Sequence, residues 1–220
     1  MRPNSNMIKN LLKKIEKHPA GRRLMTDPLF RALVTSSVSM SWNLIYALFN
    51  LGLGAAYRSF WFISMAAYYV ILGVMRLYAV SCGSRGGARP AVMRRCGFGM
   101  TALGVALSGI VCMAIAEKHN PKYHIVVMIA VAAFTFYLVV QTILNTVKAH
   151  KKKDGTLIVL RNISLASVIG SVLSLERSML GTFGDAGDRF SSAVEAISGA
   201  AAFLLLLSMG LWMIRRAGRE

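Results

Sequence analysis

Two rows of hydroxyl and amide side chains recur at helical spacing within long apolar stretches of the sequence. The first row is Ser36, Ser39, Asn43, Tyr46 and Asn50, at intervals of three and four residues. The second row is Ser164, Ser167, Ser171, Ser174 and Ser178. Because residues three and four apart share one face of an α-helix, each row forms a polar stripe. Such a stripe suits hydrogen bonding to a small solute or to a neighbouring helix.

We expect both stripes to point into the protein, because lipid tails offer hydroxyl and amide groups no hydrogen-bond partner. The candidate substrate-binding residues are Ser39, Asn43, Tyr46, Asn50, Ser171, Ser174 and Ser178. The alternative is a dry seam, in which small side chains let helices pack closely. Asn43 and Asn50 favour a solute pathway, because two amides are more than close packing requires.

Charged residues within the apolar stretches are the next candidates, because each is costly in lipid and therefore usually functional or interfacial. Glu176 and Glu195 lie near the expected outer boundary, and either could bind a proton or cation that drives transport. The alternative is that both simply lie at the interface. At 100° per residue Glu176 falls almost opposite the serine row, so its helix should be the most enclosed. Arg76 and Arg161 should lie at the inner edge, where long side chains reach the headgroups.

A third polar row, Tyr137, Gln141 and Asn145, has the spacing of one helix face. It predicts either a hydrogen-bonded seam between helices or a substrate contact in the inner half of the membrane.

Motifs for enzymatic chemistry are absent from the sequence. It contains no His-Glu-x-x-His, no Gly-x-Ser-x-Gly and no Walker loop. The four histidines lack metal-ligand spacing. We therefore predict no catalytic residue, no metal site and no cofactor.

The elements that must position these residues are six apolar stretches, each about long enough to cross a bilayer core of roughly 30 Å as a helix. They are 32–57, 60–76, 97–116, 124–146, 160–182 and 192–214. A composition of 55% hydrophobic and 16% charged residues agrees, since it does not fit a soluble globular chain. The sequence thus predicts an all-α polytopic membrane protein with six transmembrane helices. The expected parts are a basic N-terminal segment with a short amphipathic helix (1–31), the transmembrane domain (32–214) and a basic tail (215–220).

The net charge of +17 is distributed unevenly across the predicted membrane. With a cytoplasmic N-terminus, 21 Lys and Arg residues fall on the cytoplasmic side and five on the other. Positive side chains are retained in the cytoplasm, where anionic lipids attract them. We therefore expect a plasma-membrane protein with both termini in the cytoplasm, in contact with anionic headgroups and without a nucleic-acid partner.

An Ala-Ala-aromatic triplet recurs in the second, fourth and sixth stretches. The copies are Ala66-Ala67-Tyr68, Ala132-Ala133-Phe134 and Ala201-Ala202-Phe203. Their offsets also align small or polar faces of the other three stretches, which favours three tandem helical hairpins with odd helices inward and even helices toward lipid. Phe60, Trp61 and Phe62 would then lie at the outer lipid interface and Trp212 near the inner one.

These patterns favour a small-solute transporter or permease with a central polar site on the first, third and fifth helices. The alternative is a non-transporting sensor, scaffold or assembly component whose polar faces bind helices of partner membrane proteins or of a second copy. An intramembrane enzyme acting on lipid is a third hypothesis.

Overall fold

The computed structural model describes residues 28–84, 89–116, 124–149, 155–183 and 189–219. All of its regular elements in these ranges are α-helices, and no strand occurs in them. The helices are α3 (Pro28–Tyr57), α4 (Phe60–Ser84), α5 (Arg89–Ala116), α6 (Ile125–Ala149), α7 (Gly155–Phe183) and α8 (Arg189–Ala217). The predicted amphipathic helix near the N-terminus lies outside the described residues.

Five of the six helices, α4 to α8, are long and apolar enough to cross a membrane. Among the described residues α3, which has 30 residues and carries Asn43 and Asn50, is not one of these five. The prediction of an all-α, six-helix polytopic membrane protein is therefore confirmed in fold class, and five of the helices have the length and apolarity of a membrane span.

The chain divides into two compact units, Met1–Ser39 and Met40–Glu220. The first unit contains the beginning of α3, which is helical from Pro28. The second unit contains the rest of α3 and the five other helices, and its side chains form the core and the candidate site.

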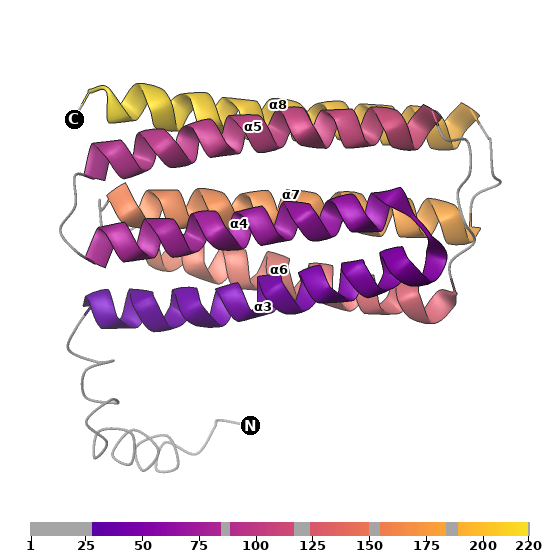
Figure 1. The fold of residues 1–220 in the computed structure, drawn as a ribbon, viewed down its shortest axis with the longest axis horizontal. Coiled ribbons are helices and arrows are strands. Elements are labelled where there is room, and N and C mark those ends of the chain that lie inside the picture. The colour runs from indigo at the N-terminus through magenta and orange to yellow at the C-terminus, as the bar shows by residue number, and fades with distance from the viewer. Residues whose placement is uncertain (1–27, 85–88, 117–123, 150–154, 184–188, 220) are drawn as a thin grey trace, which may run out of the picture. The chain divides into compact units, whose positions relative to one another are not determined.

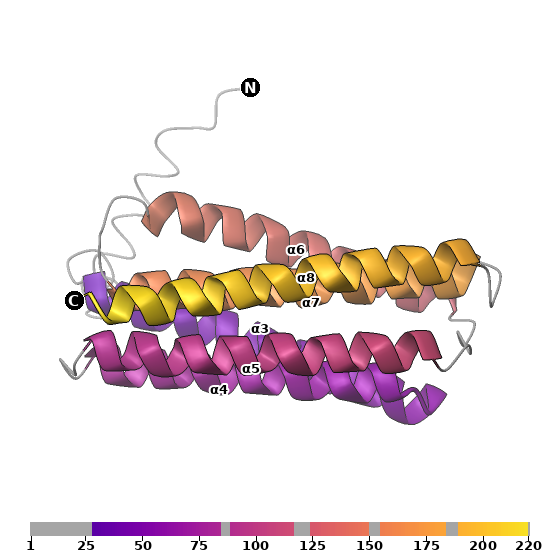
Figure 2. The same ribbon diagram turned by 90° about the horizontal axis from the view of Figure 1, so that it is seen from above.

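Within Met40–Glu220 the helices form two facing layers. One layer consists of α3, α4 and α5, and the other of α6, α7 and α8 (Figures 1 and 2). The helix α5 lies beside α8 and α4 beside α7, while α3 reaches α6 through aromatic side chains. Because successive helices run in opposite directions, each facing pair is antiparallel (Figure 1).

This packing differs from the tandem-hairpin hypothesis. Among the described residues α5 packs most extensively on α8, and α6 on α7, whereas α5 and α6 do not form a closely packed hairpin. Glycines explain the α5–α8 pairing, because they let two backbones approach. A Cβ added at Gly97 would lie 3.0 Å from the carbonyl oxygen of Gly210, and one at Gly199 would lie 2.5 Å from Val111 Cγ1.

The expected alternation of inward odd helices and lipid-facing even helices is wrong for α4, which is buried, and for α5, which is not. Half of the most apolar stretch of α4 and of α7 is buried, against a third or less in α5, α6 and α8. The helix α7 is thus as enclosed as expected, but it shares that position with α4. Trp61 and Phe62 are buried rather than at the lipid interface, whereas Phe60 and Trp212 are exposed as predicted.

Two tyrosines explain why α4 faces inward. Tyr68 Oη donates to the carbonyl oxygen of Ala166 at 2.9 Å, and Tyr69 Oη donates to that of Ser167 at 3.1 Å. A buried aromatic side chain gains from apolar contact while its hydroxyl bonds the facing backbone. Gly170 makes room for them, since a Cβ there would lie 2.7 Å from Tyr68 Cε1.

Candidate functional site

The polar stripes of α3 and α7 point into the protein. Every candidate side chain that the structure describes is at most 2% exposed. These side chains are Asn43, Tyr46, Asn50, Ser171, Ser174 and Ser178. The side chain of Ser39 lies outside the described residues. The prediction that these side chains point into the protein is therefore confirmed for all six described residues. We use the name central seam for a slightly different set, which is Asn43, Tyr46, Asn50, Ser167, Ser171 and Ser174.

Two side chains of α3 reach serines of α7 across the central seam, Asn43 toward Ser167 and the Tyr46 hydroxyl toward Ser174. Asn43 Nδ2 donates to Ser167 Oγ at 3.4 Å, a long bond. Asn50 Nδ2 instead donates to the carbonyl oxygen of Tyr46 in its own helix, at 2.8 Å. The hydroxyls of Ser167 and Ser171 likewise donate to backbone carbonyls of α7. Three of the four hydrogen bonds that these side chains donate therefore stay within their own helix.

Four buried polar atoms of the central seam make no hydrogen bond of good geometry. They are Asn43 Oδ1, Tyr46 Oη, Asn50 Oδ1 and Ser174 Oγ. The Tyr46 hydroxyl interacts only weakly with the side chains of Asn50 and Ser174, outside good hydrogen-bond geometry, so three of the four atoms gather between α3 and α7. Each unsatisfied buried group costs about 1–3 kcal/mol. The seam consequently holds hydrogen-bonding capacity that the chain itself does not use.

Aromatic rings close the seam on the side of α6. The ring of Tyr46 stacks on Phe134 with centroids 3.7 Å apart and meets the edge of Tyr69 at 4.7 Å. Tyr137, the first member of the third polar row, contacts Trp42 at 4.8 Å. Its row therefore begins with an aromatic contact to α3, and the side chain of Asn145 lies outside the described residues.

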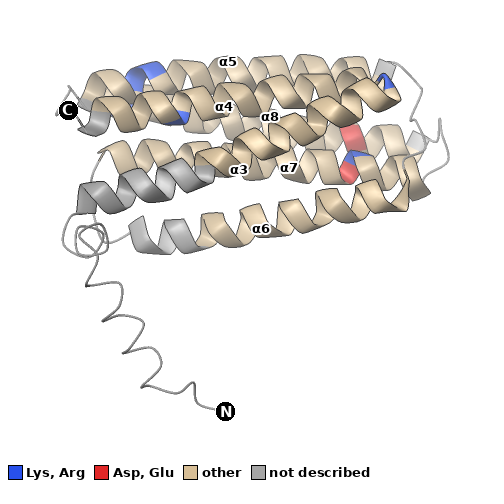
Figure 3. Ribbon diagram, turned by 60° about the horizontal axis from the view of Figure 1, so that its bottom comes forward, with Lys and Arg blue, Asp and Glu red and all other residues tan. Residues whose placement is uncertain are grey.

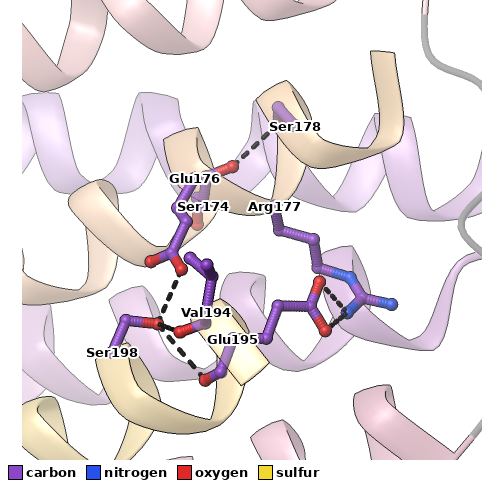
Figure 4. Close-up of polar contacts among 7 residues, drawn as sticks. All are labelled: Ser174, Glu176, Arg177, Ser178, Val194, Glu195 and Ser198. Carbon is purple, nitrogen blue, oxygen red and sulfur yellow. Dashed lines mark hydrogen bonds and ion pairs between the residues drawn. The ribbon is translucent and has the colours of Figure 1, made fainter. Parts of the chain in front are cut away.

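A second polar site lies nearer the ends of α7 and α8, at the end of the bundle where α3 turns into α4 (Figure 3). Arg177 Nη1 contacts both carboxylate oxygens of Glu195, at 3.0 and 3.1 Å. Ser198 Oγ donates to Glu176 Oε1 at 2.7 Å (Figure 4). We call Glu176, Arg177, Glu195 and Ser198 the outer charge cluster. The two predicted coupling residues are thus brought together, around an arginine.

The outer charge cluster borders a small crevice of about 10 Å³, roughly the room for one water molecule. The crevice is also lined by Trp61 from α4 and by Val111 and Ala114 from α5, so four helices meet there. The Arg177 guanidinium lies over the Trp61 ring, 5.0 Å from its centroid, and this contact buries the positive charge on an aromatic face. With all three charged groups ionised, the cluster carries one excess negative charge.

Sequence reasoning assigned no site role to two members of this cluster, Arg177 and Ser198. It also placed Trp61, which lines the crevice beside them, at the lipid interface. The signal that could have found Arg177 is its place beside Glu176 within an apolar stretch, because a buried carboxylate calls for a nearby cation.

Arg76 also departs from expectation. It was predicted to extend to the inner lipid headgroups, but it is only 3% exposed, and its Nη2 donates to Ser164 Oγ at 2.7 Å. The serine row of α7 therefore extends past the central seam to a buried cation on α4. Arg161 is half-buried.

Among the described residues no group of three or more His, Cys, Asp or Glu side chains could hold a metal ion. No protein-family model, curated protein or solved structure matches this chain.

Proposed function

We propose that this membrane protein transports a small solute through the central seam. The observation that supports this most is the position of four polar atoms without a hydrogen bond of good geometry where two three-helix layers of opposite direction meet. Many transporters consist of two halves inverted relative to each other, with the substrate site at their interface near the middle of the membrane. The layers α3–α5 and α6–α8 have the relative direction that such an inversion produces.

The uneven packing between the layers supports a rocking motion. On one side α5 and α8 approach closely through glycines. On the other side α3 reaches α6 and α7 through the side chains of Trp42, Asn43 and Tyr46. Because side chains change rotamer more easily than helix backbones separate, the layers would part at α3 and pivot at α5–α8.

The outer charge cluster is the proposed coupling group. Its excess negative charge would be neutralised by a proton or a monovalent cation, and the three charges join α7 to α8. We expect Glu176→Gln or Glu195→Gln to abolish uptake driven by a pH or sodium gradient in liposomes. Unchanged gradient-driven uptake in both variants would contradict coupling at this cluster.

Thiol labelling tests the route without knowledge of the substrate. Single cysteines would replace Asn50 or Ser174 in a background in which the native Cys82, Cys96 and Cys112 are serine. We expect a water-soluble, membrane-impermeant maleimide to modify both positions, because a solute route must open to water. Leu48, which is 60% exposed on the apolar side of α3, is the matched lipid-facing control and should resist modification.

Complete protection of positions 50 and 174 would indicate a permanently packed seam and would contradict transport. The non-transporting alternative then gains a direct test, since a scaffold or assembly component should co-purify with a stoichiometric partner.

The proposal also includes a plasma-membrane location with both termini in the cytoplasm and basic segments on anionic lipid. The charge distribution supports this orientation. Reporter fusions at each terminus would test it, and an extracytoplasmic signal from either terminus would contradict it.

A further inference from the structure

We infer that the central seam binds a small uncharged molecule that carries both hydrogen-bond donors and acceptors, such as a polyol or a small amide. This inference rests on the transport function proposed above and names the class of its substrate.

The four atoms without a hydrogen bond of good geometry define the hydrogen-bonding pattern of the ligand. The amide oxygens of Asn43 and Asn50 accept hydrogen bonds, while the hydroxyls of Tyr46 and Ser174 can donate or accept. A ligand must therefore present donors to the two amide oxygens, and an acceptor on it would take the hydroxyl proton of Tyr46 or Ser174. Tyr46, Asn50 and Ser174 gather at one point, so a molecule with few heavy atoms can reach all three.

The surroundings of these atoms favour an uncharged ligand. The described contacts of the central seam are to serine, tyrosine and phenylalanine side chains and to backbone carbonyls. The two buried arginines at the ends of the serine row are engaged elsewhere, since Arg177 of α7 pairs with Glu195 and Arg76 of α4 donates to Ser164. A charged ligand would lose its hydration here without gaining an opposite charge.

Aromatic rings add a surface for the carbon atoms of such a ligand. The Tyr46 ring stacks on Phe134 and meets the edge of Tyr69. A polyol or amide offers CH groups that pack on aromatic faces while its polar atoms bond the seam. Binding would require the Tyr46 ring to move away from Phe134. Such a movement is possible because α3 contacts α6 through aromatic side chains, which can change rotamer.

Solute flux into liposomes that contain the full chain tests the inference. Stopped-flow light scattering would follow glycerol, erythritol, urea and acetamide as uncharged probes, and sodium lactate and choline chloride as charged ones. We expect at least one uncharged probe to enter about tenfold faster than into empty liposomes, and Asn50→Leu to remove about a tenfold factor, which corresponds to losing one well-placed hydrogen-bonding group. Both charged probes should enter at the rate of empty liposomes.

Two further variants keep the result interpretable if Asn50→Leu fails to fold. Ser174→Ala removes a single hydroxyl and should lower flux about threefold while leaving the folded fraction unchanged. Ser208→Ala is the matched control, since Ser208 lies on the exposed face of α8 and its hydroxyl donates to its own helix at Leu205. Its flux should equal that of the unmodified chain.

Three results would contradict the inference, and they differ in whether the proposed transport function also fails. Fast flux of a charged probe with slow flux of all four uncharged probes would overturn the substrate class and leave transport standing. Flux of water alone would also overturn it, because the seam would then hold water and no solute. Slow flux of every probe, together with full protection of positions 50 and 174 from maleimide, would overturn both the class and the transport function.

Discussion

The α5–α8 interface and the central seam each join helices from the two layers, but through different kinds of contact. Along α5–α8, Gly97 and Gly210 face each other, and a Cβ on either would lie within 3.0 Å of the other's carbonyl oxygen. Contact there is between backbones and apolar side chains, with Leu206 and Met213 fully buried. In the central seam the helices meet through long polar and aromatic side chains, and four polar atoms make no hydrogen bond of good geometry.

The difference separates a fixed interface from an adaptable one. Helices in lipid associate through close packing and satisfied polar groups, so α5–α8 follows the general rule. The central seam breaks it, and proteins tend to break such rules where a function needs the departure. The outer charge cluster belongs with the seam, since it too places costly groups inside the bundle.

Arg177→Met should have the largest effect on stability, because it leaves the Glu195 carboxylate buried without a cation. We expect a loss of about 3–5 kcal/mol in unfolding free energy, measured by titration from mild detergent into SDS. The double variant Arg177→Met with Glu195→Gln should recover most of that loss, since neither charge remains. A loss below about 1 kcal/mol for the single variant would mean that the ion pair is solvated. The outer charge cluster could then no longer be grouped with the central seam as a set of buried polar residues.

Gly210→Ala should cost less but should test the fixed interface directly. The added methyl would lie 2.9 Å from the Gly97 carbonyl oxygen and 3.1 Å from Thr101 N, so two backbones must move apart. We expect a loss of about 2–3 kcal/mol in the same SDS titration. Gly73→Ala is the matched control on α4, where a Cβ meets no atom within 4 Å. Equal stabilities of the two variants would show that α5–α8 is not closely packed.

The inward direction of both stripes was predictable because two simple facts combine. Side chains three and four residues apart share a helix face, and hydrocarbon offers no partner to hydroxyls or amides. Asn43 and Ser174 therefore had to point into the bundle, whatever the order of the helices around it. The same reasoning identified Glu176 and Glu195, since carboxylates are scarce and costly in apolar stretches.

The partner of each helix was not predictable, because lipid tails and protein cores are equally apolar. Nothing in the apolarity of Trp61 or Phe62 distinguishes a lipid-facing ring from a buried one. Likewise the pairing of α5 with α8 depends on Gly97 and Gly210, which are 113 residues apart in the sequence. The two glycines face each other only when the helices are already aligned. Periodicity within one helix carries no information about that alignment.

The smallest expected effects concern two equally buried tyrosines whose hydroxyl groups have different partners. Tyr46 and Tyr68 are each 2% exposed, but Tyr68 Oη donates to the carbonyl oxygen of Ala166, whereas Tyr46 Oη makes no hydrogen bond of good geometry. Tyr68→Phe should therefore lose about 1 kcal/mol of unfolding free energy, and Tyr46→Phe should lose none or gain up to about 1 kcal/mol. Equal losses would mean that Tyr46 is as well satisfied as Tyr68. The central seam would then be an ordinary packed interface, with no hydrogen-bonding capacity left for a solute.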